Sequence, residues 1–171
     1  SITIPSSLTE LKDNWCSYVY ELKQIKVMPN NPRYKVYDDK FIIGKSSIEQ
    51  DNYDILVFCV RNIENVTIPS FIEIIGPYSF SHCKNLQQIE IPNDSKLQII
   101  GEYAFSYTPI KNISIPSSLT HINEKAFSYC EQLRIIEFGE FIDVQLMDMK
   151  ILGSSAQSVI IMIHYFIKNS F

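Results

Sequence analysis

The side chains best suited to nucleophilic or metal chemistry are those of four cysteines and three histidines. They are Cys16, Cys59, Cys83, Cys130, His82, His121 and His164. A cysteine nucleophile needs a histidine within hydrogen-bond reach and a third group that orients that histidine. His82 and Cys83 are neighbours, but adjacent residues seldom face each other in this way, and no set of Cys and His has zinc-ligand spacing. The five glycines form no phosphate-binding loop. We therefore expect no catalytic, cofactor-binding or metal-binding residue, and no cofactor.

Cys83 and Cys130 instead share one position of a sequence repeat. Each follows a repeated phenylalanine by three residues, and Thr108 stands at that position in the copy between them. Strands of neighbouring copies would lie about 4.8 Å apart, which separates the two cysteines by roughly 9–10 Å. A disulfide bridges Cα atoms up to about 7 Å apart. We expect both cysteines to be unpaired, small, buried side chains.

The repeat that positions these residues runs from residue 66 to 139. One marker is the proline that closes an Ile-x-Ile-Pro motif or a variant of it. The other is the phenylalanine of a short motif in which Ser or Ala precedes it and Ser follows it. The markers are Pro69, Pro92 and Pro116, and Phe80, Phe105 and Phe127. The prolines are 23 and 24 residues apart and the phenylalanines 25 and 22. Two independent markers with one such period are typical of a solenoid.

Each copy carries the spacing Leu-x-x-Ile-x-Ile, as in Leu86–Ile91. The alternation at its end predicts a short strand whose apolar side chains face inward. One strand cannot bury that face alone, so neighbouring copies are expected to stack in parallel around a continuous core. The expected fold is a leucine-rich repeat solenoid, a right-handed arc of strand and irregular segments with one short parallel strand per 23–24-residue repeat.

We interpret residues 1–171 as a single solenoid domain in four parts. These are a degenerate repeat (1–28), a non-repeat island (29–62), the regular repeats (63–139) and a degenerate terminal repeat or cap (140–171). In the island, two β-prone runs flank a polar loop, which predicts an inserted β-hairpin-like unit. The opening residues nearly repeat Ser114–Thr120, so the chain begins inside a repeat and we expect a fragment of a longer array.

The most apolar run, Val159–Ile163, is predicted to be the last strand. It extends to Ile167, about half of the roughly 20 residues that a membrane span needs. The alternative is the start of a membrane-associated segment that is cut off, and we expect no membrane span in this fragment. The formal net charge is −4, both signs are scattered along the chain, and there is no basic stripe. A nucleic-acid partner is therefore not expected.

The motif offsets resemble the BspA-like (Treponema pallidum type) leucine-rich repeat family. The resemblance lies in Leu86-x-x-Ile89-x-Ile91-Pro92, Ile100-Gly101-x-x-Ala104-Phe105 and Ala126-Phe127-x-x-Cys130. It covers residues 2–139, with departures at Ser79, Thr108, Asn123 and Gly139. The resemblance implies a cell-surface or secreted protein of a mucosal bacterium or protozoan parasite. It also implies adhesion to host cells or matrix proteins, or co-aggregation, and supplies no catalytic residue.

The remaining candidate chemistry is a polar ladder of outward-facing strand positions, which we expect to bind a protein partner or to be merely solvated. The candidate partner-binding residues are Lys23, Lys26, Glu64, Thr67, Gln88, Glu90, Lys111, Ser114, Arg134 and Glu137. Tyr34, Tyr37 and Tyr53 of the island are a second candidate surface, with packing onto the hairpin as the alternative.

Three sequons, at Asn65, Asn93 and Asn112, are possible N-glycosylation sites. Glycans at Asn65 and Asn112 would block the ladder, because both residues occupy one strand position. The alternative to an adhesin-like module is an intracellular leucine-rich repeat scaffold with no adhesion role. The sequence leaves the oligomeric state and the identity of the partner open.

Overall fold

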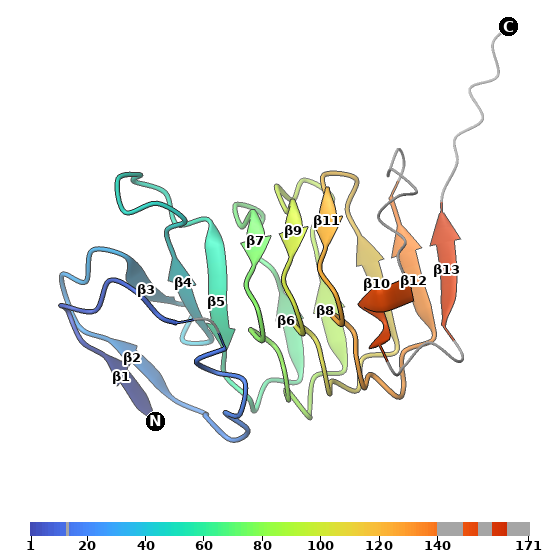
Figure 1. The fold of residues 1–171 in the computed structure, drawn as a ribbon, viewed down its shortest axis with the longest axis horizontal. Coiled ribbons are helices and arrows are strands. Elements are labelled where there is room, and N and C mark those ends of the chain that lie inside the picture. Colours follow the sequence, from blue (N-terminus) through green and yellow to red (C-terminus); the bar gives the residue numbers. More distant parts are fainter. Residues whose placement is uncertain (13, 140–148, 154–158, 164–171) are drawn as a thin grey trace, which may run out of the picture.

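The structure is a computed structural model that describes residues 1–12, 14–139, 149–153 and 159–163. Short strands are stacked side by side along one long axis, with β1 near one end and β13 at the other (Figure 1). The described chain is a β-solenoid with very little helix: η2 (Met149–Ile151) is a single three-residue 3-10 turn. This confirms the predicted solenoid.

The first ladder consists of four strands that the Leu-x-x-Ile-x-Ile motif predicts, followed by the strand predicted from the apolar run Val159–Ile163. They are β6 (Asn65–Thr67), β8 (Gln88–Glu90), β10 (Asn112–Ile115), β12 (Ile135–Phe138) and β13 (Ile160–Ile163). Hydrogen bonds join β6 to β8 and join β10, β12 and β13, all in parallel. The strand predicted over Val159–Ile163 is confirmed as β13, and the rest of that apolar run lies outside the described residues.

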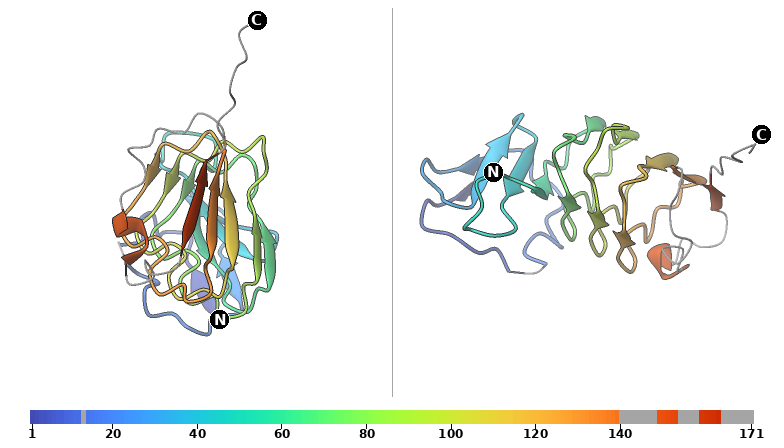
Figure 2. Two further views of the ribbon diagram at one scale, coloured as in Figure 1. Left: turned by 90° about the vertical axis from the view of Figure 1, so that its right-hand side faces the viewer. Right: turned by 90° about the horizontal axis from the view of Figure 1, so that it is seen from above.

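Each regular repeat also has a second strand that the sequence analysis did not assign. These strands are β7 (Ile74–Ile75), β9 (Ile99–Ile100) and β11 (His121–Ile122), and they pair in parallel. The expectation of one strand per repeat is therefore corrected to two. Two-residue strands carry no readable alternation, which is why the pattern did not reveal them. The two ladders lie on different sides of the solenoid (Figure 2).

The island contributes three antiparallel strands at the end of this second ladder. They are β3 (Tyr34–Tyr37), β4 (Phe41–Gly44) and β5 (Ile55–Cys59). β5 then pairs in parallel with β7, so the hairpin extends the ladder into one six-stranded sheet. At the N-terminal end, β1 (Ile2–Ile4) and β2 (Ile25–Val27) form a separate parallel pair.

A column of phenylalanines fills the core between the ladders. The rings of Phe80, Phe105 and Phe127 are stacked with centroids 5.2 and 5.4 Å apart, and Phe41 of the island meets Phe80 edge-on at 6.2 Å. All four side chains are at most 1% exposed. Full burial of a phenylalanine side chain stabilises a fold by about 1.5–3 kcal/mol. The repeat phenylalanine is therefore the main packing unit of each turn.

Candidate functional site

The outward side chains of the first ladder form columns, because the paired strands lie in register. Asn65 lies opposite Gln88 and Thr67 opposite Glu90 across β6 and β8. Ser114 lies opposite Glu137 across β10 and β12. One column consists of the amides Asn65, Gln88 and Asn112. The last column alternates hydroxyl and carboxylate groups along Thr67, Glu90, Ser114 and Glu137. We call the outward side of β6, β8, β10 and β12 the ladder face.

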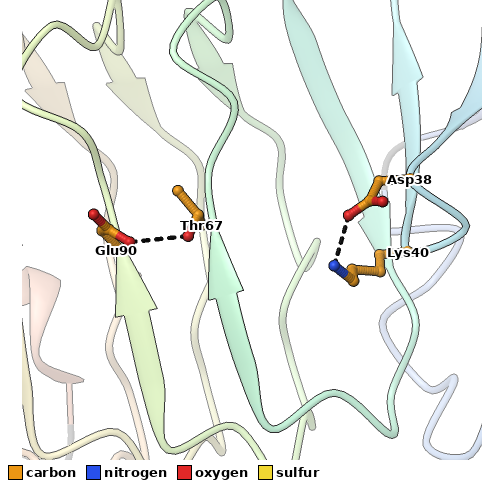
Figure 3. Close-up of polar contacts among 4 residues, drawn as sticks. All are labelled: Asp38, Lys40, Thr67 and Glu90. Carbon is orange, nitrogen blue, oxygen red and sulfur yellow. Dashed lines mark hydrogen bonds and ion pairs between the residues drawn. The ribbon is translucent and has the colours of Figure 1, made fainter.

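A groove of about 670 Å³, the central groove, crosses the ladder face. It is lined by Asp38, Lys40, Asn65, Val66, Thr67, Gln88, Ile89, Glu90, Asn112, Ile113 and Ser114. Three neighbouring strands provide its floor, and the turn between β3 and β4 provides Asp38 and Lys40 at one end. Figure 3 shows these two residues beside Thr67 and Glu90. The groove is mostly polar, with short apolar patches where the inward-facing residues reach the surface.

Hydrogen bonds between strands order the carboxylates of the last column. Thr67 Oγ1 donates to Glu90 Oε2 at 3.0 Å, and Ser114 Oγ donates to Glu137 Oε2 at 2.9 Å. At the end of the groove, Lys40 Nζ lies 2.6 Å from Asp38 Oδ2 (Figure 3). A carboxylate that is already oriented loses less rotamer freedom when it binds a partner. The Thr67–Glu90 bond therefore presents Glu90 to the groove as a preorganised anionic acceptor.

A second groove, of about 520 Å³, lies on the other side of the amide column. It is lined by Glu64, Lys84, Asn85, Gln87, Gln88, Pro109, Lys111, Asn112 and Gln132, and it shares Gln88 and Asn112 with the central groove. We call it the basic groove, because its cations are Lys84 and Lys111. The ladder face thus places negative charge on one side of the amide column and mainly positive charge on the other.

Six of the ten residues predicted from the sequence line these two grooves. They are Glu64, Thr67, Gln88, Glu90, Lys111 and Ser114. Arg134 and Glu137 belong to the neighbouring turn, and the Arg134 guanidinium donates to the carbonyls of Glu131 and Leu133 at 2.9 and 3.0 Å. Lys23 and Lys26 are exposed at the separate β1–β2 pair and line neither groove.

Sequence reasoning missed Asp38 and Lys40. Both residues are exposed in the turn between β3 and β4. Repeat offsets carry no information on where an inserted hairpin points, so its turn could not be assigned to the groove. Of the island tyrosines, Tyr34 follows the packing alternative, because it is only 6% exposed and its hydroxyl accepts the Leu11 N–H at 3.1 Å.

The structure instead exposes a row of rings beside the basic groove. His82 stacks on Tyr107 at 4.3 Å and Tyr107 on Tyr129 at 4.4 Å, while Tyr20 meets His82 edge-on at 4.4 Å. We call these four residues the aromatic row. Partial burial, with Arg61 and Lys84 nearby, lowers the pKa of His82. The signal was present in the sequence, because His82, Tyr107 and Tyr129 occupy one repeat position.

The three sequons occupy different surroundings. Asn65 and Asn112 are exposed and line the central groove, whereas Asn93 is exposed in the turn after Pro92 and lines neither groove. A glycan on either strand asparagine would therefore occupy the central groove.

Within the described ranges, no group of three or more His, Cys, Asp or Glu side chains is arranged to hold a metal ion. No helix in the described part of the chain is long and apolar enough to cross a membrane.

Residues 54–162 match the BspA type leucine rich repeat region family in six copies. The match spans more than half of the chain, and the chain therefore belongs to this family. No curated protein matches it.

Three solved structures show the same fold. A leucine rich cell surface protein from Faecalibacterium prausnitzii aligns with a TM-score of 0.65 and 22% identity over 99% of this chain and 48% of its own. A leucine-rich repeat protein from Eubacterium ventriosum aligns at 0.68 and 19%, over 95% and 48%. The pneumococcal vaccine antigen PcpA aligns at 0.62 and 18%, over 81% and 38%. The chain thus spans about half the length, or less, of these structures.

Proposed function

We propose that this chain is a non-catalytic protein-interaction module and that its ladder face binds the partner. The observation that carries the proposal is the central groove, which runs across three parallel strands and contains a carboxylate ordered by a hydrogen bond from Thr67 to Glu90. Solenoids commonly bind partners on such extended faces.

The charge pattern of the ladder face favours a polar protein segment. Glu90 in the central groove favours a basic side chain, whereas Asp38 there is already paired with Lys40. Lys84 and Lys111 in the basic groove favour acidic side chains. The amide column between them offers both donors and acceptors, which suits peptide groups. The groove is not built for a large apolar ligand, because apolar side chains form only three of its eleven lining residues.

We further propose that the parent protein is exposed at the cell surface or secreted, and that it adheres to host cells or extracellular-matrix proteins. Family membership supports this proposal, as does the fold shared with a protein described as a cell surface protein. An intracellular scaffold is the alternative. Surface labelling of cells that carry the full-length protein distinguishes the two, because only an exposed protein is labelled without permeabilisation.

The test uses recombinant chain with labelled host cells and with immobilised matrix proteins. Saturable binding is expected, and the double substitution Gln88→Arg and Asn112→Arg is expected to abolish it, because bulky side chains would fill both grooves. Circular dichroism and the melting temperature serve as folding controls, since both residues are exposed. Saturable binding that survives the double substitution would move the site away from the ladder face.

A further inference from the structure

A small pocket lies where three parts of the chain meet at the N-terminal end of the solenoid (Figure 1). The irregular segment between β1 and β2 forms one side, the island strands β3, β4 and β5 form another, and the turn after β7 completes it. The volume of the pocket is about 130 Å³. We call it the junction pocket, and it shares no lining residue with the central groove or the basic groove.

The wall of the junction pocket is mostly apolar. Leu11 and Trp15 line it from the irregular segment, and Ile55 and Val57 line it from β5. All four side chains are half-buried, so a ligand that covers them removes further apolar surface from water. An apolar cavity of about 150 Å³ holds one benzene molecule. The junction pocket therefore has room for an apolar body of about six carbon atoms.

The charged residues that line the junction pocket, Lys12, Arg33 and Lys45, are all cations. Neither ion pair found among the described residues involves any of them. The Lys45 ammonium lies over the ring of Tyr53, which does not line the pocket, at 5.4 Å from its centroid. Lys12 is exposed, whereas Arg33 is half-buried. Arg33 is therefore the cation best placed to meet an anion inside the pocket.

Backbone carbonyls hold the Arg33 side chain in place. Its Nε donates to the Lys45 carbonyl at 3.1 Å, and its Nη1 donates to the Thr9 carbonyl at 3.0 Å. Its Nη2 makes no hydrogen bond to a described residue. The planar guanidinium matches the geometry of a carboxylate, and a side chain that is already ordered loses less rotamer freedom on binding. Arg33 is thus a preorganised cation with an unused donor group.

We propose that the junction pocket binds a small monocarboxylate whose apolar body has about six carbon atoms. The body packs against Trp15 and the β5 side chains, and the carboxylate accepts hydrogen bonds from the Arg33 guanidinium. An inorganic anion has no apolar surface to bury against this wall, and an amine is repelled by the three cations. The junction pocket is separate from the ladder face, so either proposal can fail without the other.

The chain contains its own reporter, because Trp15 is its only tryptophan and lines the pocket. The test follows tryptophan emission while the wild-type chain is titrated with sodium hexanoate, with sodium acetate keeping the ionic strength constant. We expect a saturable blue shift, as hexanoate displaces water from the half-buried ring, with a dissociation constant on the order of 1 mM. 1-Hexanol and hexylamine have the same alkyl chain without a negative charge, and should bind at least about tenfold more weakly. No response to hexanoate, or equal affinity for hexanoate and 1-hexanol, would overturn the proposal.

Two variants test the role of the cations. Arg33→Gln should weaken hexanoate binding at least about tenfold and leave 1-hexanol binding unchanged, which a merely structural role of Arg33 would not produce. Lys12→Glu leaves the Arg33 contacts intact, places an anion at the exposed rim and should also weaken hexanoate binding alone. Lys96→Glu is the matched control and should bind both compounds as the wild type does, because the exposed Lys96 does not line the pocket. Wild-type hexanoate affinity in Lys12→Glu, or equal losses for hexanoate and 1-hexanol in Arg33→Gln, would contradict the assignment.

Discussion

At the scale of single residues, two buried serines lie two positions apart in opposite environments. Ser79 Oγ is buried and makes no hydrogen bond within the described structure, whereas Ser81 Oγ lies 2.8 Å from Ser106 Oγ. The next two copies have Ala104 and Ala126 at the position of Ser79, so an alanine methyl group fits this slot. The hydroxyl of Ser79 therefore loses its hydrogen bonds to water on folding and makes none within the described structure in return.

Ser79→Ala should stabilise the protein by about 1 kcal/mol, because it removes a buried hydroxyl that has no partner. Urea denaturation measures the free energy of unfolding. Ser81→Ala is the matched control and should destabilise the fold by about 1 kcal/mol through loss of its hydrogen bond. Equal effects of the two substitutions would show that the environment of Ser79 is described wrongly.

Alkaline pH should destabilise the fold through Cys16. Burial raises its pKa from 9.0 to about 11 in the folded chain. A raised folded pKa means that this stability is fully present below pH 9 and is lost as the pH rises toward 11. Two pKa units correspond to about 3 kcal/mol.

Melting temperatures at a series of pH values test this prediction. Cys16→Ala should show a smaller loss of melting temperature between pH 9 and 11 than the wild type. It should retain part of the loss, because the raised pKa values of Cys59 and Cys130 act in the same direction. A wild type and a Cys16→Ala variant with the same pH profile would exclude Cys16 as a cause.

At the scale of elements, one glycine is required where consecutive turns approach each other. A Cβ atom on Gly101 would lie 2.6 Å from the backbone nitrogen of Pro77 and 2.8 Å from the carbonyl carbon of Gly76. In the next copy, Asn123 has the equivalent position with an exposed side chain.

Gly101→Ala should therefore destabilise the protein by about 2 kcal/mol, because two backbone segments must separate. The matched control, Asn123→Ala, should change the stability by less than about 0.5 kcal/mol. Chemical denaturation of both variants gives the comparison. If Gly101→Ala is as stable as Asn123→Ala, the close approach of the turns at Pro77 is incorrect.

The strands β6, β8 and β10 could be predicted from the sequence because each carries an alternating apolar pattern that leads to a proline, and β12 because it keeps the same spacing. The second ladder could not, since Ile74–Ile75 and its equivalents are two residues long and show no period. Likewise, the repeat placed Thr67 and Glu90 on one face, but it could not place Asp38 there. The burial of Arg61 could not be predicted, because no sequence pattern marks a buried cation.

At the scale of the whole molecule, glycosylation and binding should compete for the central groove. When the chain is produced in a eukaryotic secretory host, glycans on Asn65 or Asn112 should abolish partner binding, because both residues line the groove. Enzymatic removal of the glycans should restore it. Removal of the third sequon by Asn93→Gln should not restore binding to the glycosylated chain, because Asn93 lines neither groove. Unimpaired binding by chain glycosylated on Asn65 would contradict a partner site in the groove.

The central claim is that the partner binds the ladder face through the opposite charges of Glu90 and Lys111. The most direct test is the dissociation constant of the partner for Glu90→Lys combined with Lys111→Glu. Glu49→Lys combined with Lys96→Glu is the control, because these exposed residues line neither groove and the net charge is again unchanged. We predict at least about tenfold weaker binding for the ladder-face variant and wild-type affinity for the control. Equal affinity of both variants and the wild type would contradict the claim.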